Sequence, residues 1–471
     1  MASWITHRVQ ATTIGNVEGT REQMAAVNEL ERDFTISAEK LREVAEAIKV
    51  EMMKGLEKDN QTVPMVPSFV PGRLTGKETG SFLALDLGGT NLRVCQVNLL
   101  GDGKFTLRQE KFTVSEPLRT GPAQKLFDYL AECVDTYLTN YSSEDPQMPH
   151  ATKLGFTFSF AVNQTAINRG TLLYWTKGFN CSGMDGKDIV GMLQDALLRK
   201  NVSVEVVALV NDTVGTLIAQ SYREPDTVLG VILGTGTNGA YYEKVSNIKK
   251  LSGGNYSPGE LMAVNTEWGA FDMERHVLPV TPYDNKLDRK SVNPRSQTYE
   301  KMISGMYLGE IVRNAVLHLV DCNLLFEAHS SVDLNRLWSF DSSYMSTIEA
   351  DATPDLAHTQ HVLESILNVP KTTLTDRRIV KKIVELVGTR AARLAAAGLV
   401  AVVEHCDALE EGCSVGIDGS LFQHYPSFRE RIVAALHELV GDNADRIKLI
   451  EAADGSGIGA AMIACLASVK K

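Results

Sequence analysis

Two short segments of this chain combine glycine with hydroxyl and amide side chains, and each follows an apolar run. They are Asp86-Leu-Gly-Gly-Thr-Asn-Leu-Arg93 and Gly234-Thr-Gly-Thr-Asn-Gly239. Each predicts a strand that turns and exposes backbone N–H groups, a common way to hold a phosphate group. Two such loops facing each other could bind a nucleotide triphosphate from both sides. Asp212, which lies between them in Val210-Asn-Asp-Thr213, could then accept a proton from the group that receives the phosphate.

Either loop alone also fits an ordinary hairpin turn, because glycine allows the backbone angles that tight turns need. Two later segments, Val415-Gly-Ile-Asp-Gly-Ser420 and Ala453-Asp-Gly-Ser-Gly-Ile-Gly-Ala460, again place small residues where the backbone can approach a ligand. This recurrence favours phosphate binding over turn chemistry alone. The first loop is neither a Walker A motif nor a dinucleotide fingerprint, because no Gly-Lys-Ser/Thr follows and the next predicted element is a strand. Asp86 could cap the turn, or it could face nucleotide-bound Mg²⁺ through water.

A second group of polar residues lies at or beside the ends of apolar runs. Carboxylate and amide groups bind neighbouring hydroxyl groups in pairs, as the recognition of a sugar requires. Each residue alone is more simply explained as a cap, a turn residue or a surface ion pair, so the interpretation rests on the set. The set is Ser159, Thr176, Lys177, Asn211, Asp212, Asn238, Glu267 and Glu300.

The elements that would position these residues alternate between strands and helices, which predicts an α/β fold. An amphipathic helix is expected over 37–57 with Ser37 as its N-cap, and the proline-containing segment 64–71 is expected to be an extended connector. The strand–loop–strand pattern around the first glycine loop recurs around the second, which indicates an internal repeat of the architecture. Segment 279–295 is expected to be a polar loop, and 328–375 is expected to form short surface helices. Further strands are predicted at 82–87, 92–99, 104–114, 153–160, 204–210, 228–233 and 239–245, and further helices at 123–138, 188–198, 304–320 and 376–404.

Composition and charge are those of an ordinary globular protein. The chain has 471 residues, of which 44% are hydrophobic and 22% charged, and this length favours two domains. The net charge of −11 argues against nucleic acid or an anionic membrane as a partner. No secretory signal is visible, no uninterrupted apolar stretch is long enough to span a bilayer, and the 7 cysteines show no metal-binding spacing. A cytoplasmic protein with buried thiols and no membrane span is therefore expected.

Taken together, the segments resemble the eukaryotic hexokinase family, in the motif order of a fungal hexokinase or glucokinase, from about Leu30 to Leu466. The two glycine loops are similar to the family's two phosphate motifs. The segment Asp418-Gly-Ser420 is similar to its adenosine-side loop. Four further segments match its sugar-binding signature, the segment that carries the base and the segments that supply sugar-binding glutamates. They are Leu154-Gly-Phe-Thr-Phe-Ser159 with Trp175-Thr-Lys-Gly-Phe179, then Val210-Asn-Asp-Thr-Val-Gly215, then Asn265-Thr-Glu-Trp-Gly269 and the run from Glu300 to Glu310.

This resemblance implies an α/β fold with two ribonuclease-H-like domains of the actin-like ATPase and sugar kinase type, hinged over a cleft. The large domain would comprise residues 15–73 and 212–455. The small domain would comprise residues 74–211 together with a C-terminal helix at 456–471. The proline-containing connector and the glycine-rich turn at 454–459 suit the crossings between them.

The resemblance also implies transfer of the γ-phosphoryl group of Mg-ATP to the 6-hydroxyl group of a hexose, chiefly glucose, as the first step of glycolysis. Asp212 would accept the hydroxyl proton, and Lys177 would lie where negative charge develops. ATP and Mg²⁺ are the implied cofactors, no side chain is assigned as a direct metal ligand, and glucose would close the cleft. The implied sugar contacts are Ser159, Phe160, Thr176, Lys177, Asn211, Asp212, Asn238, Glu267 and Glu300, and the implied nucleotide contacts are Asp86, Leu87, Gly88, Gly89, Thr90, Asn91, Arg93, Lys111, Thr235, Gly236, Thr237, Gly419 and Ser420.

One segment departs from the family pattern. After Ser159 the family usually has Tyr-Pro or a similar turn, whereas this chain has Phe160-Ala-Val-Asn163, and loss of the proline is expected to loosen the loop. Two alternatives to an active enzyme are a sugar sensor that transfers phosphate poorly and an actin- or chaperone-like ATPase. Retention of Lys177 and Asp212 argues against the first, and the sugar segments argue against the second. Acceptance of fructose and mannose is left open, as is assembly as a monomer or a homodimer.

Overall fold

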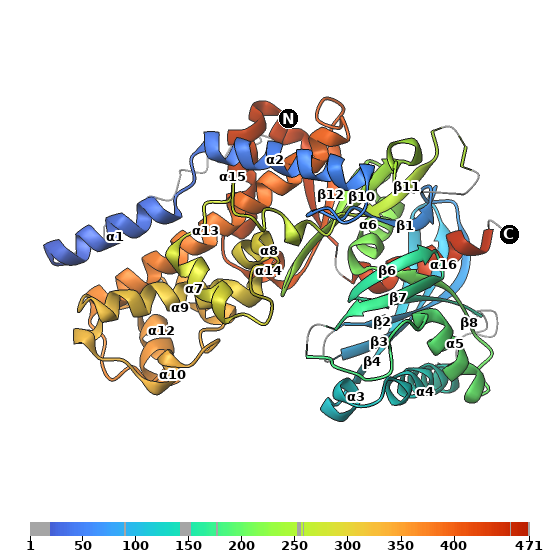
Figure 1. The fold of residues 1–471 in the computed structure, drawn as a ribbon, viewed down its shortest axis with the longest axis horizontal. Helices are drawn as coiled ribbons and strands as arrows, with labels where there is room; N and C mark the ends of the chain where they lie inside the picture. Colours follow the sequence, from blue (N-terminus) through green and yellow to red (C-terminus); the bar gives the residue numbers. More distant parts are fainter. Residues whose placement is uncertain are drawn as a thin grey trace, which may run out of the picture.

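The computed structural model contains two large β-sheets and a separate hairpin, with helices around and between them (Figure 1). The five-stranded sheet lies at one end of the molecule, the six-stranded sheet lies nearer the middle, and the opposite end is helical. The described residues are 19–88, 91–141, 152–175, 178–251, 256–257, 259–452 and 454–469.

The five-stranded sheet has the strand order β4-β3-β2-β5-β8. β2 is antiparallel to β3 and parallel to β5, and β5 is parallel to β8. The apolar runs of β2 and β5 are buried, as expected for central strands with covered faces. Because β2, β5 and β8 are parallel, the polar residues that follow them reach one edge of the sheet. The strands are β2 (Thr79–Leu87), β3 (Asn91–Gly101), β4 (Lys104–Thr113), β5 (Lys153–Phe158) and β8 (Glu205–Val210).

The six-stranded sheet repeats this topology and adds one edge strand, in the order β1-β11-β10-β9-β12-β13. β9 is antiparallel to β10 and parallel to β12, just as β2 is to β3 and β5. The predicted internal repeat is thereby confirmed. β1, predicted as an extended connector, pairs with β11 at the sheet edge, where proline is tolerated. The strands are β1 (Val66–Pro71), β9 (Thr227–Leu233), β10 (Thr237–Lys244), β11 (Leu261–Asn265), β12 (Cys413–Asp418) and β13 (Ile447–Glu451).

The largest hydrophobic core is built around α13 (Leu374–His405), a helix of 32 residues that is buried along most of its length. α2 (Ala38–Glu57), α9 (Gly305–Asp321) and α15 (Phe428–Val440) pack against it. By length and composition α13 could cross a membrane, although charged residues such as Arg390 and Arg393 interrupt its apolar sequence. Because 89% of its apolar window is buried inside the protein, packing in the core explains its hydrophobicity.

Two helices lie between the sheets. α6 (Asp212–Arg223) packs on β9 and β10 of the six-stranded sheet, whereas α16 (Gly455–Val469) packs on β2 and β5 of the five-stranded sheet. The two helices also pack on each other at glycines, since a Cβ atom on Gly459 would lie 2.0 Å from the Gly215 carbonyl oxygen. Glycine is therefore required for this close crossing. The boundaries predicted for the two domains stay a prediction.

Nearly all predicted strands and helices are present, but several observed elements were not predicted, among them α6, α15, β11 and β13. The predicted loop 279–295 contains α7 (Pro282–Lys290), whose sequence signal is a capping box between Thr281 and Asp284 rather than an apolar stripe. The hairpin of β6 (Ala161–Ala166) and β7 (Arg169–Tyr174) was not predicted. Within the described residues, the other α-helices are α1 (Arg21–Phe34), α3 (Glu116–Thr120), α4 (Ala123–Tyr141), α5 (Ile189–Arg199), α8 (Thr298–Ile303), α10 (Val332–Asn335), α11 (Ser342–Ala350), α12 (Ala357–Gln360) and α14 (Ser420–His424).

Candidate active site

Asp86 lies near the end of β2 and is 4% exposed. Its Oδ2 atom accepts hydrogen bonds from Arg93 (Nε at 3.1 Å, Nη2 at 2.5 Å) and from Ser456 Oγ at 2.8 Å. Arg93 also forms an ion pair with Asp454, directly before α16. Burial disfavours the charge of Arg93, but the carboxylates of Asp86 and Asp454 outweigh it and raise the pKa. Asp86 is therefore a fixed carboxylate, held from both β3 and α16.

This placement changes the role expected for Arg93. The guanidinium group was predicted to contact the nucleotide, but two carboxylates already engage it. Its cross-strand partner Lys111 is an exposed residue of β4 on the same face of the sheet. Lys111 is thus the more accessible of the two predicted cations.

The first glycine loop joins β2 to β3. Leu87 is buried, so its side chain packs in the core rather than facing a ligand. The Gly88 N–H donates to the Asn91 carbonyl oxygen at 3.3 Å, which closes the turn, and Asn91 is exposed. The predicted contacts Gly89 and Thr90 lie outside the described residues.

Asn211 and Asp212 follow β8 and begin α6. The Asn211 side chain is the N-cap and accepts from the Thr213 N–H at 2.9 Å. Asp212 Oδ1 accepts from the same N–H at 2.9 Å. The N-terminus of a helix favours negative charge, and the hydrogen bond from the Thr213 N–H orients the half-buried Asp212 side chain.

Asp418 lies at the end of β12, on the opposite side of the site from Asp212. Burial raises the pKa of Asp418 to about 6, and the nearby carboxylates of Asp454 and Asp212 contribute to the rise. The Gly419 N–H and the Arg93 guanidinium oppose it. The carboxylates of Asp212, after β8, and of Asp418, at the end of β12, therefore lie in one region. This is the arrangement expected if the two glycine loops face each other.

Three residues of this region were not predicted as site residues: Asp418, Asp454 and Ser456. Both aspartates belong to an Asp-Gly-Ser tripeptide that follows an apolar strand, at 418–420 and at 454–456. The repeated tripeptide was the sequence signal that could have identified them.

The second glycine loop, between β9 and β10, contacts other segments through its backbone. The Gly305 N–H donates to the Gly234 carbonyl oxygen at 2.8 Å. Gly419 has a φ of 122°, and a Cβ atom there would lie 2.8 Å from the Gly234 nitrogen, so glycine is required for the approach. The predicted contacts Thr235 and Ser420 are both exposed. The loop that follows β9 and the loop that follows β12 therefore lie directly against each other, backbone to backbone.

Thr237 and Gly236 link this loop to a predicted sugar contact. The Thr237 N–H donates to Glu300 Oε2 at 3.0 Å, and a Cβ atom on Gly236 would lie 2.7 Å from the same oxygen. The Thr237 side chain is buried and its Oγ1 accepts from Trp268 Nε1 at 3.2 Å. Thr237 therefore holds Glu300 through its backbone N–H, while its side chain faces the core; its predicted contact with nucleotide stays a prediction.

Glu267 is held by two asparagines. Its Oε1 atom accepts from Asn238 Nδ2 at 3.0 Å and from Asn265 Nδ2 at 2.7 Å. Its backbone N–H donates to the Oδ1 atoms of the same residues at 3.0 Å and 3.2 Å. The amides thus bind the glutamate on both sides and fix its carboxylate.

A cleft with about 730 Å³ of empty volume opens beside these residues. Phe160 and Asn211 line one part of it, and Glu267 lines another. Asn265 and Gln297 also line the cleft and were not predicted. Two aromatic rings, of Phe158 and Phe160, and several aliphatic side chains line the rest. An apolar wall with a few convergent polar groups is typical of a small-molecule site.

Both aromatic rings in the cleft lining, Phe158 and Phe160, belong to a cluster of four aromatic side chains. The Phe160 centroid lies 4.7 Å from that of Phe158, 4.9 Å from that of Trp175 and 5.0 Å from that of Phe179. Trp175 Nε1 donates to the Cys181 carbonyl oxygen at 2.9 Å. This packing fixes Phe160 at the wall of the cleft.

The altered segment after Ser159 starts a strand, and Ser159 itself is buried. Ala161 pairs with Tyr174 in the β6–β7 hairpin. Proline lacks an N–H group and fits poorly in such a ladder, whereas alanine allows it to start here. The expected loosening is therefore replaced by strand pairing. Thr176 and Lys177, directly after β7, lie outside the described residues.

Comparisons with known proteins agree along the chain. Two family models, both described as hexokinase, match residues 26–222 and 228–466. A hexokinase of Kluyveromyces lactis is 42% identical over 452 residues, which covers 94% of this chain and 92% of that protein. Hexokinase-2 of Saccharomyces cerevisiae is 39% identical over 463 residues, which covers 95% of this chain and 93% of that protein. The structure of a Schistosoma mansoni hexokinase complexed with glucose superimposes with a TM-score of 0.85 at 35% identity, covering 95% of this chain and 100% of that one.

Proposed function

Since the chain belongs to the hexokinase family, we propose that its cleft transfers the γ-phosphoryl group of ATP to the 6-hydroxyl group of glucose. The position of Asp212 carries this assignment. Its neighbour Asn211 lines the cleft, and its own charge acts on Asp418 on the phosphate side. A carboxylate in that place is within reach of both substrates.

Asp212 acts as the general base. It accepts the proton of the 6-hydroxyl group while that oxygen bonds to the γ-phosphorus. The bond from the γ-phosphorus to the bridging oxygen breaks, and ADP leaves with the bonding electron pair. The hydrogen bond from the Thr213 N–H at the start of α6 holds Asp212 Oδ1 in place for this proton transfer.

The sugar is bound by a polar ring around the cleft. Glu267, which two asparagines hold, and Glu300, which the Thr237 N–H holds, present carboxylates that accept from pairs of hydroxyl groups. Gln297 supplies an amide on the same side. The other proposed sugar contacts are Asn211, Asn238, Asn265, Ser159, Phe160, Thr176 and Lys177, with the Lys177 ammonium group at the migrating phosphoryl group.

The nucleotide is bound mainly by backbone groups of the two glycine loops and of Gly419, with Asn91, Thr235 and Ser420 at their exposed edges. Arg93 takes a different role from that first expected. It holds Asp86 in place through its two hydrogen bonds, while Lys111 supplies the accessible positive charge.

The residues present fit Mg²⁺, the cation that the family implies. Burial is the main cause of the raised pKa of Asp418, and the nearby carboxylates of Asp454 and Asp212 add to it. A bound cation would relieve the repulsion among these carboxylates. Among the described residues no group of three or more acidic, His or Cys side chains is arranged to hold a metal ion. Asp86 and Asp418 would therefore contact Mg²⁺ through water, and the bound ion would neutralise phosphate charge.

The decisive experiment measures ADP and sugar 6-phosphate formation by the purified protein with Mg-ATP and glucose, fructose or no sugar. Product is expected with glucose, and little ADP without sugar. Asp212→Ala and Asp212→Asn are expected to lower kcat by about 100- to 10,000-fold, because the general base is lost. Glucose binding, measured by calorimetry, is expected to persist. Unchanged turnover in these variants would contradict the assignment of the base.

The same assay tests the range of substrates. Equal rates with glucose and fructose would mark a broad hexokinase, and glucose alone would mark a glucokinase. Glucose binding without phosphate transfer would instead favour the sugar sensor.

A cytoplasmic location and a monomeric or homodimeric state are also part of this proposal. All seven cysteines lie within the described residues and are free thiols, which suits a reducing compartment. Light scattering after size-exclusion chromatography reports the oligomeric state directly.

A further inference from the structure

Asp288, on α7, lies at the centre of a buried polar network outside the cleft. Its Oδ1 atom accepts from Lys301 Nζ at 2.7 Å, and its Oδ2 atom accepts from Arg275 Nη2 at 2.6 Å. Both oxygens also accept from the Arg295 N–H at 3.1 Å. Asp288 is 6% exposed and Lys301 is 4% exposed, so water cannot replace these partners.

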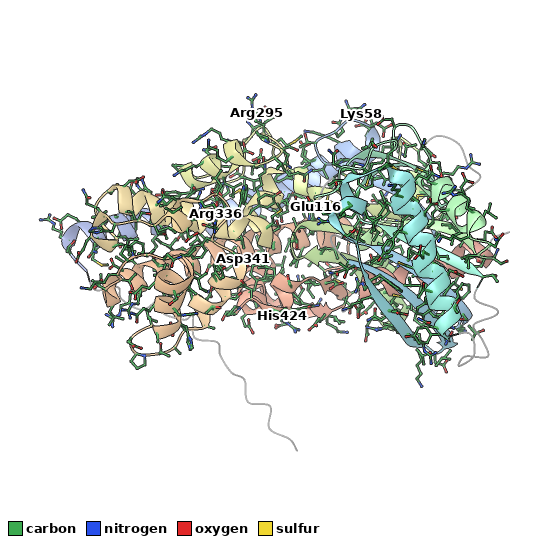
Figure 2. The ribbon with its side chains drawn as sticks, turned by 90° about the horizontal axis from the view of Figure 1, so that it is seen from below. Lys58, Glu116, Arg295, Arg336, Asp341 and His424 are labelled. Atoms are coloured by element: carbon green, nitrogen blue, oxygen red, sulfur yellow. The ribbon has the colours of Figure 1, made fainter. Side chains whose placement is uncertain are left out.

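This network holds the loop 291–297, which joins α7 to α8. Lys301 Nζ donates to the Asn293 carbonyl oxygen at 2.7 Å, and Asp288 binds the loop at the Arg295 amide. The Arg295 side chain points outward from the molecule (Figure 2), so its backbone makes the contact with Asp288. Two points of the loop are therefore tied to one carboxylate and its paired ammonium group.

The loop ends at the proposed sugar contacts. Gln297 is its last residue and lines the cleft, and the Lys301 N–H donates to the Gln297 carbonyl oxygen at 3.0 Å. Glu300 is the direct neighbour of Lys301 on α8. A shift of Lys301 or of the loop would therefore move both Gln297 and Glu300.

The space around these two side chains is narrow. A Cβ atom on Gly269 would lie 2.5 Å from Gln297 Oε1 and 3.1 Å from Glu300 Cβ. Gln297 also has a φ of 55°, which is unfavourable for a residue other than glycine and persists only when its surroundings impose it. The network around Asp288 is the part of the surroundings that fixes the loop leading to this residue.

Loss of one charge from the network would leave another buried charge uncompensated. Burial lowers the pKa of Lys301, and Asp288 counteracts this through its hydrogen bond and charge. Burial likewise opposes the charge of Asp288, but Lys301, the Arg295 N–H and Arg275 outweigh it and lower the pKa. Removal of one partner therefore drives the other to move toward solvent.

We propose that Asp288 is a positioning residue for sugar binding, which sets the affinity for the hexose by holding Gln297 and Glu300 through Lys301 and the loop 291–297. This inference rests on the proposed sugar site. Asp288 does not touch the substrate, so its effect reaches the sugar through geometry alone. A misplacement of about 1 Å in such a site can cost roughly 100-fold.

The test compares Asp288→Asn with Asp284→Asn in the full-length protein. Asp284 is a matched control, because it is a buried carboxylate on the same helix that lines the same small cavity as Asp288. Its partners are Arg390, at 2.6 Å and 2.7 Å, which joins α7 to α13, and Thr281 in the capping box of α7; neither belongs to the loop. Thermal unfolding of both variants measures their loss of stability.

Asp288→Asn is expected to raise KM for glucose about 10- to 100-fold while kcat and KM for ATP stay within about twofold. Asp284→Asn is expected to lose at least as much thermal stability with KM for glucose within about twofold of the wild type. Lys301→Met, a second route to the same disruption, is expected to raise KM for glucose, and Asp288→Glu is expected to recover part of the loss.

Two outcomes would overturn the inference in distinguishable ways. If Glu300→Gln raises KM for glucose but Asp288→Asn changes it no more than Asp284→Asn does, Asp288 is merely structural. If Glu300→Gln and Gln297→Ala both leave KM for glucose unchanged, the assigned sugar site is wrong and the inference falls with it.

Discussion

Glu267 and Gln297, both of which line the cleft, have left-handed backbone angles, with φ of 53° and 55°. For residues other than glycine this conformation costs about 1–2 kcal/mol. At Glu267 the bonds to Asn238 and Asn265 hold the backbone and the carboxylate together. Both residues are proposed sugar contacts, so a fixed backbone at these two positions favours binding.

Asp418 leads to a prediction about pH. Its pKa of about 6 lies above the ordinary value of 3.8, so the folded state binds a proton that the unfolded chain releases. Stability therefore falls as the pH rises from about 4 to about 6, and the full cost is present at pH 7. Asp418→Asn cannot ionise, so it is expected to raise the free energy of unfolding of the ligand-free protein at pH 7 by about 1–3 kcal/mol.

Urea unfolding of both proteins at pH 5 and pH 7 measures this effect. The difference between them is expected to be smaller at pH 5, where part of the Asp418 carboxyl is protonated in the folded protein. An equal difference at both pH values would show that Asp418 does not titrate in this window.

At the scale of elements, the crossing of α6 and α16 joins the two sheets. A Cβ atom on Gly215 would lie 2.8 Å from the Ser456 carbonyl oxygen, and one on Gly155 of β5 would lie 2.0 Å from the Ala460 carbonyl oxygen. α6 carries Asp212 at its first position, and α16 follows Asp454 and carries Ser456 in its first turn. The spacing of α6 and α16 therefore sets the distance between Asp212, the proposed base, and the Asp454 carboxylate.

Gly459→Ala is expected to destabilise the protein by about 1–3 kcal/mol and to lower kcat, because the added methyl group forces α6 and α16 apart. Denaturant unfolding and steady-state kinetics measure the two effects. Gly191→Ala on α5 is the control, since its Cβ atom would lie 3.5 Å from its nearest neighbour, Asp188 Oδ1. The control is expected to be neutral or stabilising by up to about 1 kcal/mol. Wild-type kcat in Gly459→Ala would show that the helix spacing does not control the site.

At the scale of the whole molecule, two sheets of the same topology contribute different chemistry to one site. Asp86, Ser159 and Asp212 lie at or after strand ends of the five-stranded sheet, whereas Asn238 and Asp418 lie on strands of the six-stranded sheet. The cleft is lined by residues of both sheets, such as Val210 of β8 in the five-stranded sheet and Asn265 of β11 in the six-stranded sheet. Ligands that contact both sides should therefore draw the sides together.

Glucose is accordingly expected to decrease the radius of gyration in small-angle X-ray scattering, because closure around the sugar removes the water-filled opening. Glu267→Gln, which weakens sugar binding, should need a higher glucose concentration for the same change. A radius that glucose leaves unchanged at saturation would contradict closure. ADP formation without sugar, measured in parallel, should stay low in the open state.

Short-range chemistry made much of this protein predictable from sequence. Glycine loops after apolar runs, the Asn211 cap before Asp212 and the recurring strand–loop–strand pattern depend on neighbours within a few residues. These features predicted the α/β fold and the repeated sheets, and they pointed to Asp212 as the candidate base. The helix α7 was missed because its polar sequence has a capping box and little apolar periodicity.

The partners of charged side chains were decided by the tertiary structure alone. Arg93, predicted to contact nucleotide, pairs with Asp454, which is 361 residues away in the chain. Asp86 accepts a hydrogen bond from Ser456, at a separation of 370 residues. Glu300, predicted as a sugar contact, also accepts a hydrogen bond from the Thr237 N–H. The sequence contains the residues for these hydrogen bonds, but it does not show which of them meet. The packing of α16 on β2 and of α8 against the β9–β10 loop brings the donor and acceptor atoms to within about 3 Å of each other. For a buried charge, the choice of partner depends on which strand ends and helix starts meet, and that choice is a property of the fold.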